Sequence, residues 1–257
     1  MDQPGHPNIL EFRTTLLTDD FIQLPSGVKL EANLSSAPQQ QTSALTKLAI
    51  CLHPWSWLGG QMRDPVLRTV KDHLLSKGYY VLRYNSRGVG RSSGWPSLTG
   101  KQEAEDLREL VSCWALPNFP NIASLVILGY SHGSLIASCF PLIKEHPSIR
   151  ISHILLSYPL GPRSWLTAFR GAHYTATLNA LLHDPQARVL VIYSDHDDFT
   201  GVGSYDNWVD SLRNEAGGVE GGPQANLEVM KIEDANHFWT NDEARHIMLR
   251  CIREWVP

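Results

Sequence analysis

Short hydrophobic runs that alternate with amphipathic segments constrain the fold of this chain more than any other feature of its sequence. Six such runs occur, at residues 48–52, 79–84, 125–128, 151–156, 189–193 and 227–232. Runs of this length are typical of strands that are buried on both faces of a sheet. Because helical patterns separate them, they predict β-α repeats and a parallel sheet with helices on both faces.

The first part of the chain has a different pattern. Residues 21–24 and 28–34 are strand-like and are joined by Pro25-Ser26-Gly27, which predicts an antiparallel hairpin. With the β-α repeats, the hairpin indicates an α/β fold with an open, mostly parallel sheet of about eight strands. The length of 257 residues fits one large domain. The polar stretches 35–46 and 213–226 have the composition of surface loops, so we predict a single domain over residues 1–257.

Two helix starts carry local signals. Asp64-Pro65 is a favourable N-cap and first-turn pair, and it predicts a helix that ends before Gly78. The segment from Thr99 to Gln102 fits a capping box at the start of a second helix. In an open sheet of this kind, ligands bind beyond the carboxyl ends of the strands. We therefore expect the functional residues directly after the hydrophobic runs.

The charge balance excludes several classes of partner. The chain has 22 Lys and Arg against 26 Asp and Glu, a net charge of −4. Nucleic acids and anionic membranes attract proteins through a basic field, so we expect neither as a partner. No hydrophobic run approaches the ~20 residues of a membrane span, and the first residues lack the basic and apolar regions of a secretory signal. We expect a cytoplasmic protein.

No cofactor or metal is expected from the motifs. The four cysteines are far apart and form no cluster with histidines, which predicts free thiols: Cys51, Cys113, Cys139 and Cys251. The turn that begins at Gly88 does not complete a dinucleotide-binding motif, because Ser93 occupies the position of the last glycine.

The strongest chemical signal is Gly129-Tyr130-Ser131-His132-Gly133, which fits the pattern G-x-S-x-G. A hydrophobic run precedes it and a helix-like segment follows, as this motif requires. A serine on such a sharp turn is held at the rim of the sheet, and the glycines avoid clashes between the two limbs of the turn. The helix N-terminus behind it offers N–H groups to an oxyanion. We predict that Ser131 is a nucleophile.

A serine nucleophile requires a base, and the base requires an orienting acid. His237 follows the run 227–232 and is the expected base. Three carboxylates follow the run 189–193, namely Asp195, Asp197 and Asp198. The chain order serine, aspartate, histidine, with each residue after a different strand, is the order associated with this serine motif.

At these residues the chain resembles the α/β-hydrolase fold family, over nearly its whole length. It is most similar to small, nearly lidless members related to dienelactone hydrolases and to short bacterial and fungal hydrolases. The resemblance rests on His53-Pro54-Trp55, on the turn 87–92, on the serine motif and on the Asp and His segments. In that family the acid stands three residues after a small strand-ending residue, here Ser194, which implies Asp197. Asp195 and Asp198 remain alternatives.

The resemblance also implies an oxyanion hole formed by two backbone N–H groups, those of Trp55 and His132. Pro54 departs from the glycine that is commoner at its position and has no N–H to donate. We expect His53 to stabilise its loop by hydrogen bonding. The His132 side chain either contacts substrate, supports the site or packs in the core.

In this family a lid is inserted between the strands predicted at 151–156 and 189–193. The intervening segment, about residues 159–187, has room only for short helices such as 164–169 and 175–182, so we predict a minimal lid. Aromatic residues gather at the expected rim and are candidates for binding an apolar or aromatic acyl substrate: Trp55, Trp57, Tyr158, Trp165 and Trp239.

These features predict a serine hydrolase, an esterase or thioesterase, that cleaves a small ester, thioester or lactone as a monomer or homodimer. Two alternatives stay open. One is a non-hydrolytic enzyme of a biosynthetic pathway that performs lactonisation, cyclisation, acyl transfer or carbon–carbon cleavage on the same fold. The other is a hydrolase-like binding protein without catalytic activity.

Overall fold

The computed structural model describes residues 20–36, 45–160, 171–217 and 226–257 of the protein. They contain one eight-stranded sheet with the order β1-β2-β4-β3-β5-β6-β7-β8. Its strands are β1 (Phe21–Gln23), β2 (Lys29–Ser35), β3 (Thr46–Leu52), β4 (Tyr80–Tyr84), β5 (Ile122–Tyr130), β6 (Arg150–Leu156), β7 (Val189–His196) and β8 (Leu227–Asn236). β1 and β2 pair antiparallel, β2 pairs antiparallel with β4, and all later pairs are parallel. The α/β architecture predicted from the hydrophobic runs is confirmed.

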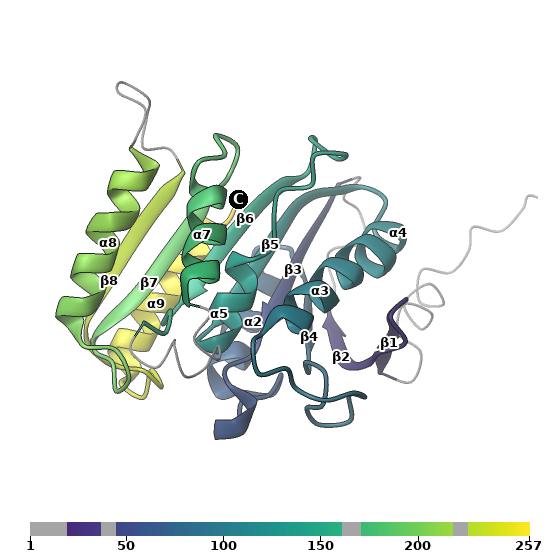
Figure 1. The fold of residues 1–257 in the computed structure, drawn as a ribbon, viewed down its shortest axis with the longest axis horizontal. Coiled ribbons are helices and arrows are strands. Elements are labelled where there is room, and N and C mark those ends of the chain that lie inside the picture. The colour runs from purple at the N-terminus through teal and green to yellow at the C-terminus, as the bar shows by residue number, and fades with distance from the viewer. Residues whose placement is uncertain (1–19, 37–44, 161–170, 218–225) are drawn as a thin grey trace, which may run out of the picture.

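Helices cover both faces of the sheet (Figure 1). α2 (Pro65–Ser76) and α9 (Asp242–Trp255) pack on one face, where their apolar side chains contact those of the central strands. The opposite face carries α3 (Lys101–Glu109), the π-helical turn η3 (Leu110–Ala115), α5 (His132–Ser138), α7 (Gly171–Leu182) and α8 (Val202–Ala216). The short elements η2 (Ser56–Leu58) and α4 (Leu116–Asn118) lie in connecting segments. Burial on both faces explains why the central strands are continuous hydrophobic runs.

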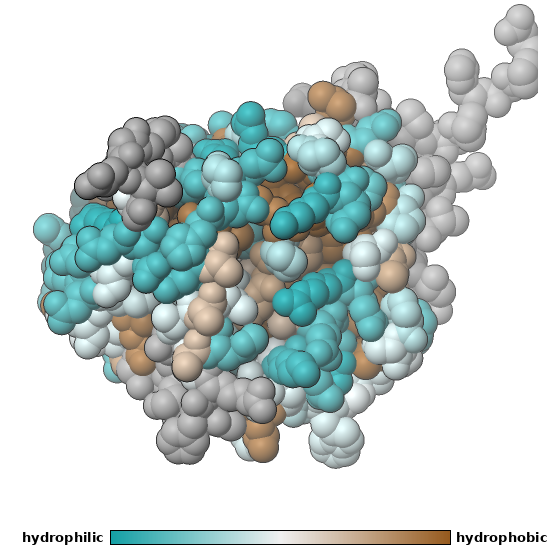
Figure 2. Space-filling model, turned by 45° about the horizontal axis from the view of Figure 1, so that its top comes forward, coloured by the Kyte–Doolittle hydropathy of each residue, from teal (hydrophilic) through white to brown (hydrophobic). Residues whose placement is uncertain are grey.

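On the face that Figure 2 shows, exposed hydrophobic residues are concentrated in one part of the molecular surface. With the top of Figure 1 turned toward the viewer, hydrophilic residues cover most of the surface and hydrophobic residues gather in a hollow near its centre (Figure 2).

The two predicted helix starts have different outcomes. α2 begins at Pro65, and Asp64 caps it by accepting a hydrogen bond from the N–H of Val66 at 2.8 Å. The capping box predicted at 99–102 is wrong. The N-cap of α3 is Gly100, with φ of 70° and no side-chain capping bond. A glycine adopts this left-handed conformation without a Cβ clash, so the chain turns into α3 through Gly100 instead.

Candidate active site

The serine turn connects β5 to α5. Ser131 has φ 54° and ψ −121°, a strained conformation for a residue with a side chain, and its N–H donates to the carbonyl of Leu156 at 2.8 Å. The flanking glycines are required by close backbone contact. A Cβ on Gly129 would lie 2.2 Å from the carbonyl oxygen of Gly133, and one on Gly133 would lie 2.5 Å from that of Leu52. The turn therefore accepts only glycine at these two positions.

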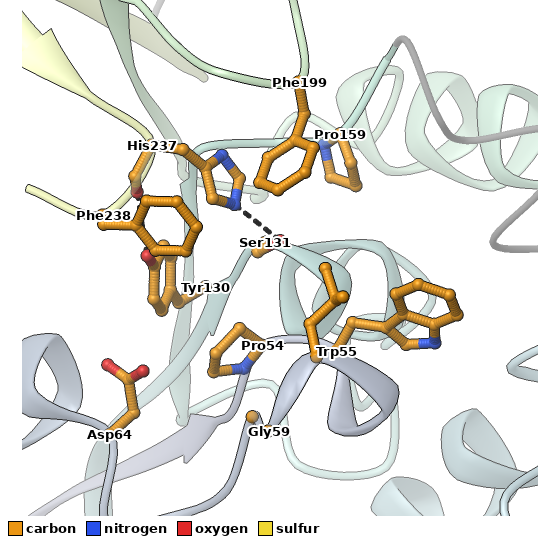
Figure 3. Close-up of a pocket in the computed structure, with 12 residues that line it drawn as sticks. Pro54, Trp55, Gly59, Asp64, Tyr130, Ser131, Pro159, Phe199, His237 and Phe238 are labelled. Carbon is orange, nitrogen blue, oxygen red and sulfur yellow. Dashed lines mark hydrogen bonds between the residues drawn. The ribbon is translucent and has the colours of Figure 1, made fainter.

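His237 lies directly after β8 and reaches the serine turn. Its Nε2 is 2.9 Å from Oγ of Ser131, and its Nδ1 is 2.7 Å from Oδ2 of Asp197. All three side chains belong to buried residues that come from the carboxyl ends of different parallel strands. Figure 3 shows the imidazole of His237 pointing at Ser131, with a dashed line for the hydrogen bond between them. The structure thus joins a hydroxyl, an imidazole and a carboxylate in one hydrogen-bonded chain.

The carboxylate of Asp197 is fixed by the loop that follows β7. Its Oδ1 accepts hydrogen bonds from the N–H groups of Phe199 and Thr200, both at 2.9 Å. The hydroxyl of Tyr205 donates to Oδ2 at the longer distance of 3.4 Å. These donors hold the carboxylate so that Oδ2 is directed at His237.

The two alternative acids point elsewhere. Asp195 pairs with the ring of His196 at 2.8 Å and accepts the N–H of Ala235 at 3.4 Å. Asp198 accepts the backbone N–H of His237 at 3.2 Å. Of the three carboxylates left open by the sequence, only that of Asp197 contacts the imidazole ring of His237.

The loop after β3 forms the wall opposite the histidine. Nδ1 of His53 donates to the carbonyl of Pro54 at 2.7 Å, and its Nε2 accepts the N–H of Ser86 at 3.0 Å. Burial lowers the pKa of His53 to about 4, so the ring is neutral and holds the loop. Trp55 lines the cavity beside Ser131. The close contact of Gly133 with the carbonyls of Leu52 and His53 places the N-terminus of α5, which begins at His132, against the same loop.

A cavity of about 400 Å³ opens above Ser131. Its described lining consists of Pro54, Trp55, Leu58, Gly59, Gly60, Asp64, Tyr130, Ser131, Pro159, Phe199, His237 and Phe238. Figure 3 shows the rings of Phe199 and Phe238 on either side of the imidazole. Aromatic and aliphatic groups form most of the wall, and Asp64 contributes a carboxylate to it.

The structure separates the aromatic residues predicted to bind substrate. Trp55 lines the cavity, whereas Trp57 is 67% exposed and stacks on Trp55 with ring centroids 6.4 Å apart. Tyr158 and Trp239 are fully buried, which corrects their predicted placement at the rim. Tyr158 stacks on Trp208, and the indole N–H of Trp239 donates to Ser157 at 3.1 Å.

Trp165 and residues 161–170 of the predicted lid segment 159–187 lie outside the described residues. The predicted helix 175–182 falls within α7, and Pro159 at the start of the segment lines the cavity.

Sequence reasoning missed several residues of the cavity wall. Phe199 is two residues after the predicted acid and Phe238 directly follows the predicted base, and that proximity was a usable signal. Asp64 was identified only as a helix cap, although the same carboxylate lines the cavity. Burial raises the pKa of Asp64.

The described residues lack two further kinds of structure. They contain no group of three or more His, Cys, Asp or Glu side chains placed to hold a metal ion. They also contain no helix that is long and apolar enough to cross a membrane.

No protein-family model matches the sequence. An uncharacterised protein of Rickettsia prowazekii (strain Madrid E), RP471, is 34% identical over 129 residues, about half of each chain (50% and 52%). An uncharacterised protein of Schizosaccharomyces pombe, C959.06c, is 25% identical over 215 residues, which are 82% of this chain and 86% of that protein.

Solved structures resemble the chain over most of its length. A putative α/β hydrolase from Agrobacterium tumefaciens, ATU1826, has a TM-score of 0.66 and 22% identity over 92% of this chain and 98% of its own. The lidless α/β serine hydrolase XC6422 from Xanthomonas campestris has a TM-score of 0.64 and 22% identity, over 92% and 94%. The Pyrococcus furiosus esterase Pf2001 has a TM-score of 0.67 and 21% identity, over 97% and 95%. At these identities the likeness concerns the fold.

Proposed function

Since the chain has the α/β-hydrolase fold, we propose that it is a serine hydrolase that cleaves a small carboxylic ester, thioester or lactone through an acyl-enzyme on Ser131. One observation carries the proposal: the chain of contacts from Ser131 Oγ to His237 Nε2, at 2.9 Å, and from His237 Nδ1 to Asp197 Oδ2, at 2.7 Å. Both distances lie within the range needed for proton transfer between nucleophile, base and orienting acid.

In the proposed acylation step, Oγ of Ser131 attacks the carbonyl carbon of the substrate and its proton passes to Nε2 of His237. The tetrahedral intermediate collapses, the bond to the leaving oxygen or sulfur breaks, and that atom takes the proton from Nε2. Water then repeats the sequence on the acyl-enzyme and releases the acid. A free serine hydroxyl is a weak nucleophile at neutral pH, so the adjacent imidazole is essential.

Asp197 acts through the imidazole. With Nδ1–H donating to its carboxylate, Nε2 is left as the acceptor for the proton of Ser131. The carboxylate also stabilises the imidazolium that forms during the reaction. The two backbone N–H groups that Asp197 accepts keep this orientation, because rotation of the carboxylate would break both bonds.

The oxyanion hole is proposed to consist of the N–H groups of Trp55 and His132. His132 is the first residue of α5, where the helix dipole favours negative charge. Trp55 lies in the loop that His53 holds through two hydrogen bonds. Donors that are fixed before the reaction stabilise the developing charge without a reorganisation cost.

The cavity supports a compact, largely apolar substrate. A volume of about 400 Å³ with walls formed by Phe199, Phe238 and Leu58 suits a short aliphatic or aromatic acyl group.

We further propose that residues 1–257 act as one domain. The free thiols of Cys51 and Cys139 in the core are consistent with a reducing, cytoplasmic setting.

The test measures hydrolysis of p-nitrophenyl esters from acetate to octanoate by the wild type, S131A and the control S56A. We expect turnover by the wild type, a loss of about 10⁴-fold or more in S131A, and little change in S56A, which removes a hydroxyl near the rim. In ¹⁸O-water the product acid should acquire label, because water ends the reaction. Turnover by S131A at the wild-type rate, or an unlabelled product, would refute the hydrolytic mechanism.

A further inference from the structure

A second cavity, of about 250 Å³, lies on the α2 side of the sheet between β2, β4 and the start of α2. Four of its eight described lining residues are arginines: Arg63, Arg68, Arg83 and Arg91, with Asp20, Ala32, Asn33 and Met62. The chain as a whole has a net charge of −4, so this concentration of guanidinium groups is a local feature.

Arg83 forms the floor of this cavity and is buried, with 8% of its surface exposed. It donates from Nη1 to the carbonyl of Met62 at 3.2 Å and from Nη2 to Oδ1 of Asn33 at 2.9 Å. Its buried Nε has no hydrogen-bond partner among the described residues, and no described carboxylate lies within 4 Å of its guanidinium. An arginine stays protonated in proteins, so the cavity contains a buried charge that no described carboxylate pairs directly, and Asp72 acts on it only from beyond 4 Å.

The two carboxylates near the cavity, those of Glu31 and Asp20, are engaged by other arginines. Arg91 pairs with Glu31 at 2.9 Å and with Asp20 at 3.6 Å, and Arg63 shares Glu31 at 3.7 Å. Within the described part of the chain, Arg68 has no ion pair. Four guanidinium groups around two carboxylates leave two positive charges uncompensated. Water hydrates the exposed guanidinium groups of Arg63 and Arg68, whereas the buried guanidinium of Arg83 is of the kind that is normally paired, so the cavity favours an anion.

We propose that this cavity binds a phosphate group, free or as a monoester. A phosphate carries negative charge to the buried Arg83 and presents several oxygens to the planar, multiply donating guanidinium groups. Arg68 and Arg63 are exposed at the mouth and Arg83 lies at the floor, so together they surround a ligand that enters from solvent.

Met62 and Arg63 belong to the same segment as Gly60 and Asp64, which line the cavity above Ser131. One segment therefore contributes lining residues to both cavities.

The experiment measures binding of sodium phosphate and of glycerol 3-phosphate by calorimetry, with sodium chloride holding the ionic strength constant. Saturable binding of at least one ligand is expected for the wild type and for S131A, which separates this site from the proposed catalytic one. The double variant R63Q/R68Q should bind at least about tenfold more weakly. Both side chains are exposed, so the variant should fold, and an unchanged thermal unfolding temperature in chloride verifies this.

The matched control is R213Q/R253Q, which removes two exposed arginines from α8 and α9 and should bind phosphate like the wild type. Tighter binding of glycerol 3-phosphate would assign the site to a phosphorylated metabolite, and equal or tighter binding of inorganic phosphate would assign it to the free ion. The proposal is overturned if neither ligand binds saturably, or if R63Q/R68Q and R213Q/R253Q bind equally.

Discussion

The hydroxyl of Tyr130 donates a hydrogen bond to the backbone carbonyl of His237 over 2.8 Å, and the ring of Tyr130 stacks against the imidazole with centroids 5.7 Å apart. Tyr130 is the residue directly before Ser131. One side chain therefore ties the segment that carries the proposed nucleophile to the segment that carries the proposed base. Their 2.9 Å contact is held by a link that lies outside the three side chains proposed to be catalytic.

Replacing Tyr130 with phenylalanine tests this link. We expect Y130F to lose about 1–2 kcal/mol of stability, because the carbonyl of His237 is left without its donor. It should also lose roughly tenfold in kcat with little change in KM, because the serine–histidine geometry loosens. Y174F is the matched control, since the buried Tyr174 donates to the backbone carbonyl of Thr99 at the same distance of 2.8 Å. Equal kcat values for the two variants would contradict the positioning role.

The choice of acid can be tested by amide substitution. D197N should lower kcat by about 10³–10⁴-fold, because an amide does not hold the imidazole in the required tautomer. D195N removes a neighbouring carboxylate that contacts His196 and not His237, and should retain activity within about threefold. Steady-state kinetics on one p-nitrophenyl ester compares both. A larger loss in D195N than in D197N would move the acid assignment to Asp195.

The pH dependence of stability has a specific source in His153. This residue lies in β6, its Nε2–H donates to the carbonyl of Phe140 at 2.8 Å, and burial lowers its pKa to about 4. The unfolded chain, with the ordinary histidine pKa, binds the proton first as pH falls. Stability from the neutral ring is therefore complete above about pH 6.5 and is lost progressively down to about pH 4.

The variant H153Q keeps an amide donor for Phe140 but does not titrate. Between pH 7 and pH 5 the wild type should lose roughly 2 kcal/mol more unfolding free energy than H153Q. Urea denaturation at the two pH values measures the difference. The same loss in both proteins would show that the ring is not held neutral in the folded state.

The carboxylate of Asp64 should select against anionic substrates. It lines the cavity above Ser131, and no described Lys or Arg does so. D64N should raise kcat/KM for a p-nitrophenyl hemisuccinate several-fold by removing like-charge repulsion, and should change that for the neutral butyrate less than about twofold. Asparagine caps helices as well as aspartate does, so α2 is preserved. D72N removes an exposed carboxylate from the same helix and should leave kcat/KM unchanged for both esters. An unchanged preference between the two esters in D64N would exclude the electrostatic role of Asp64.

The features that depend on packing against a regular sheet could be predicted from the sequence. Hydrophobic runs located the strands because the central strands are buried on both faces. The chain order of Ser131, Asp197 and His237 indicated convergence because parallel strands end at one edge of the sheet. Which of three adjacent carboxylates meets the imidazole depends on the turn after β7, where Asp197 accepts the N–H groups of Phe199 and Thr200. That detail is not visible in composition or periodicity.

The directions in which loop side chains point were the features predicted least well from the sequence. Trp57 and Trp239 both follow strands near the site. Trp57 stacks on Trp55 and does not line the cavity, whereas Trp239 is buried and donates a hydrogen bond to Ser157. Arg83 was hidden inside a run that appeared uniformly hydrophobic, and only the structure shows its guanidinium among other arginines. Residue type predicts burial on average, whereas the backbone of each loop decides where one side chain points.

If Ser131 carries the acyl group, a reagent that reacts with activated serines should label it. The protein is treated with a fluorophosphonate, digested and analysed by mass spectrometry, with H237A treated in parallel. We expect one phosphonate per chain, on the peptide that contains Ser131, and a strongly reduced labelling rate in H237A. A label on another residue, or no label on a protein that hydrolyses esters, would contradict it.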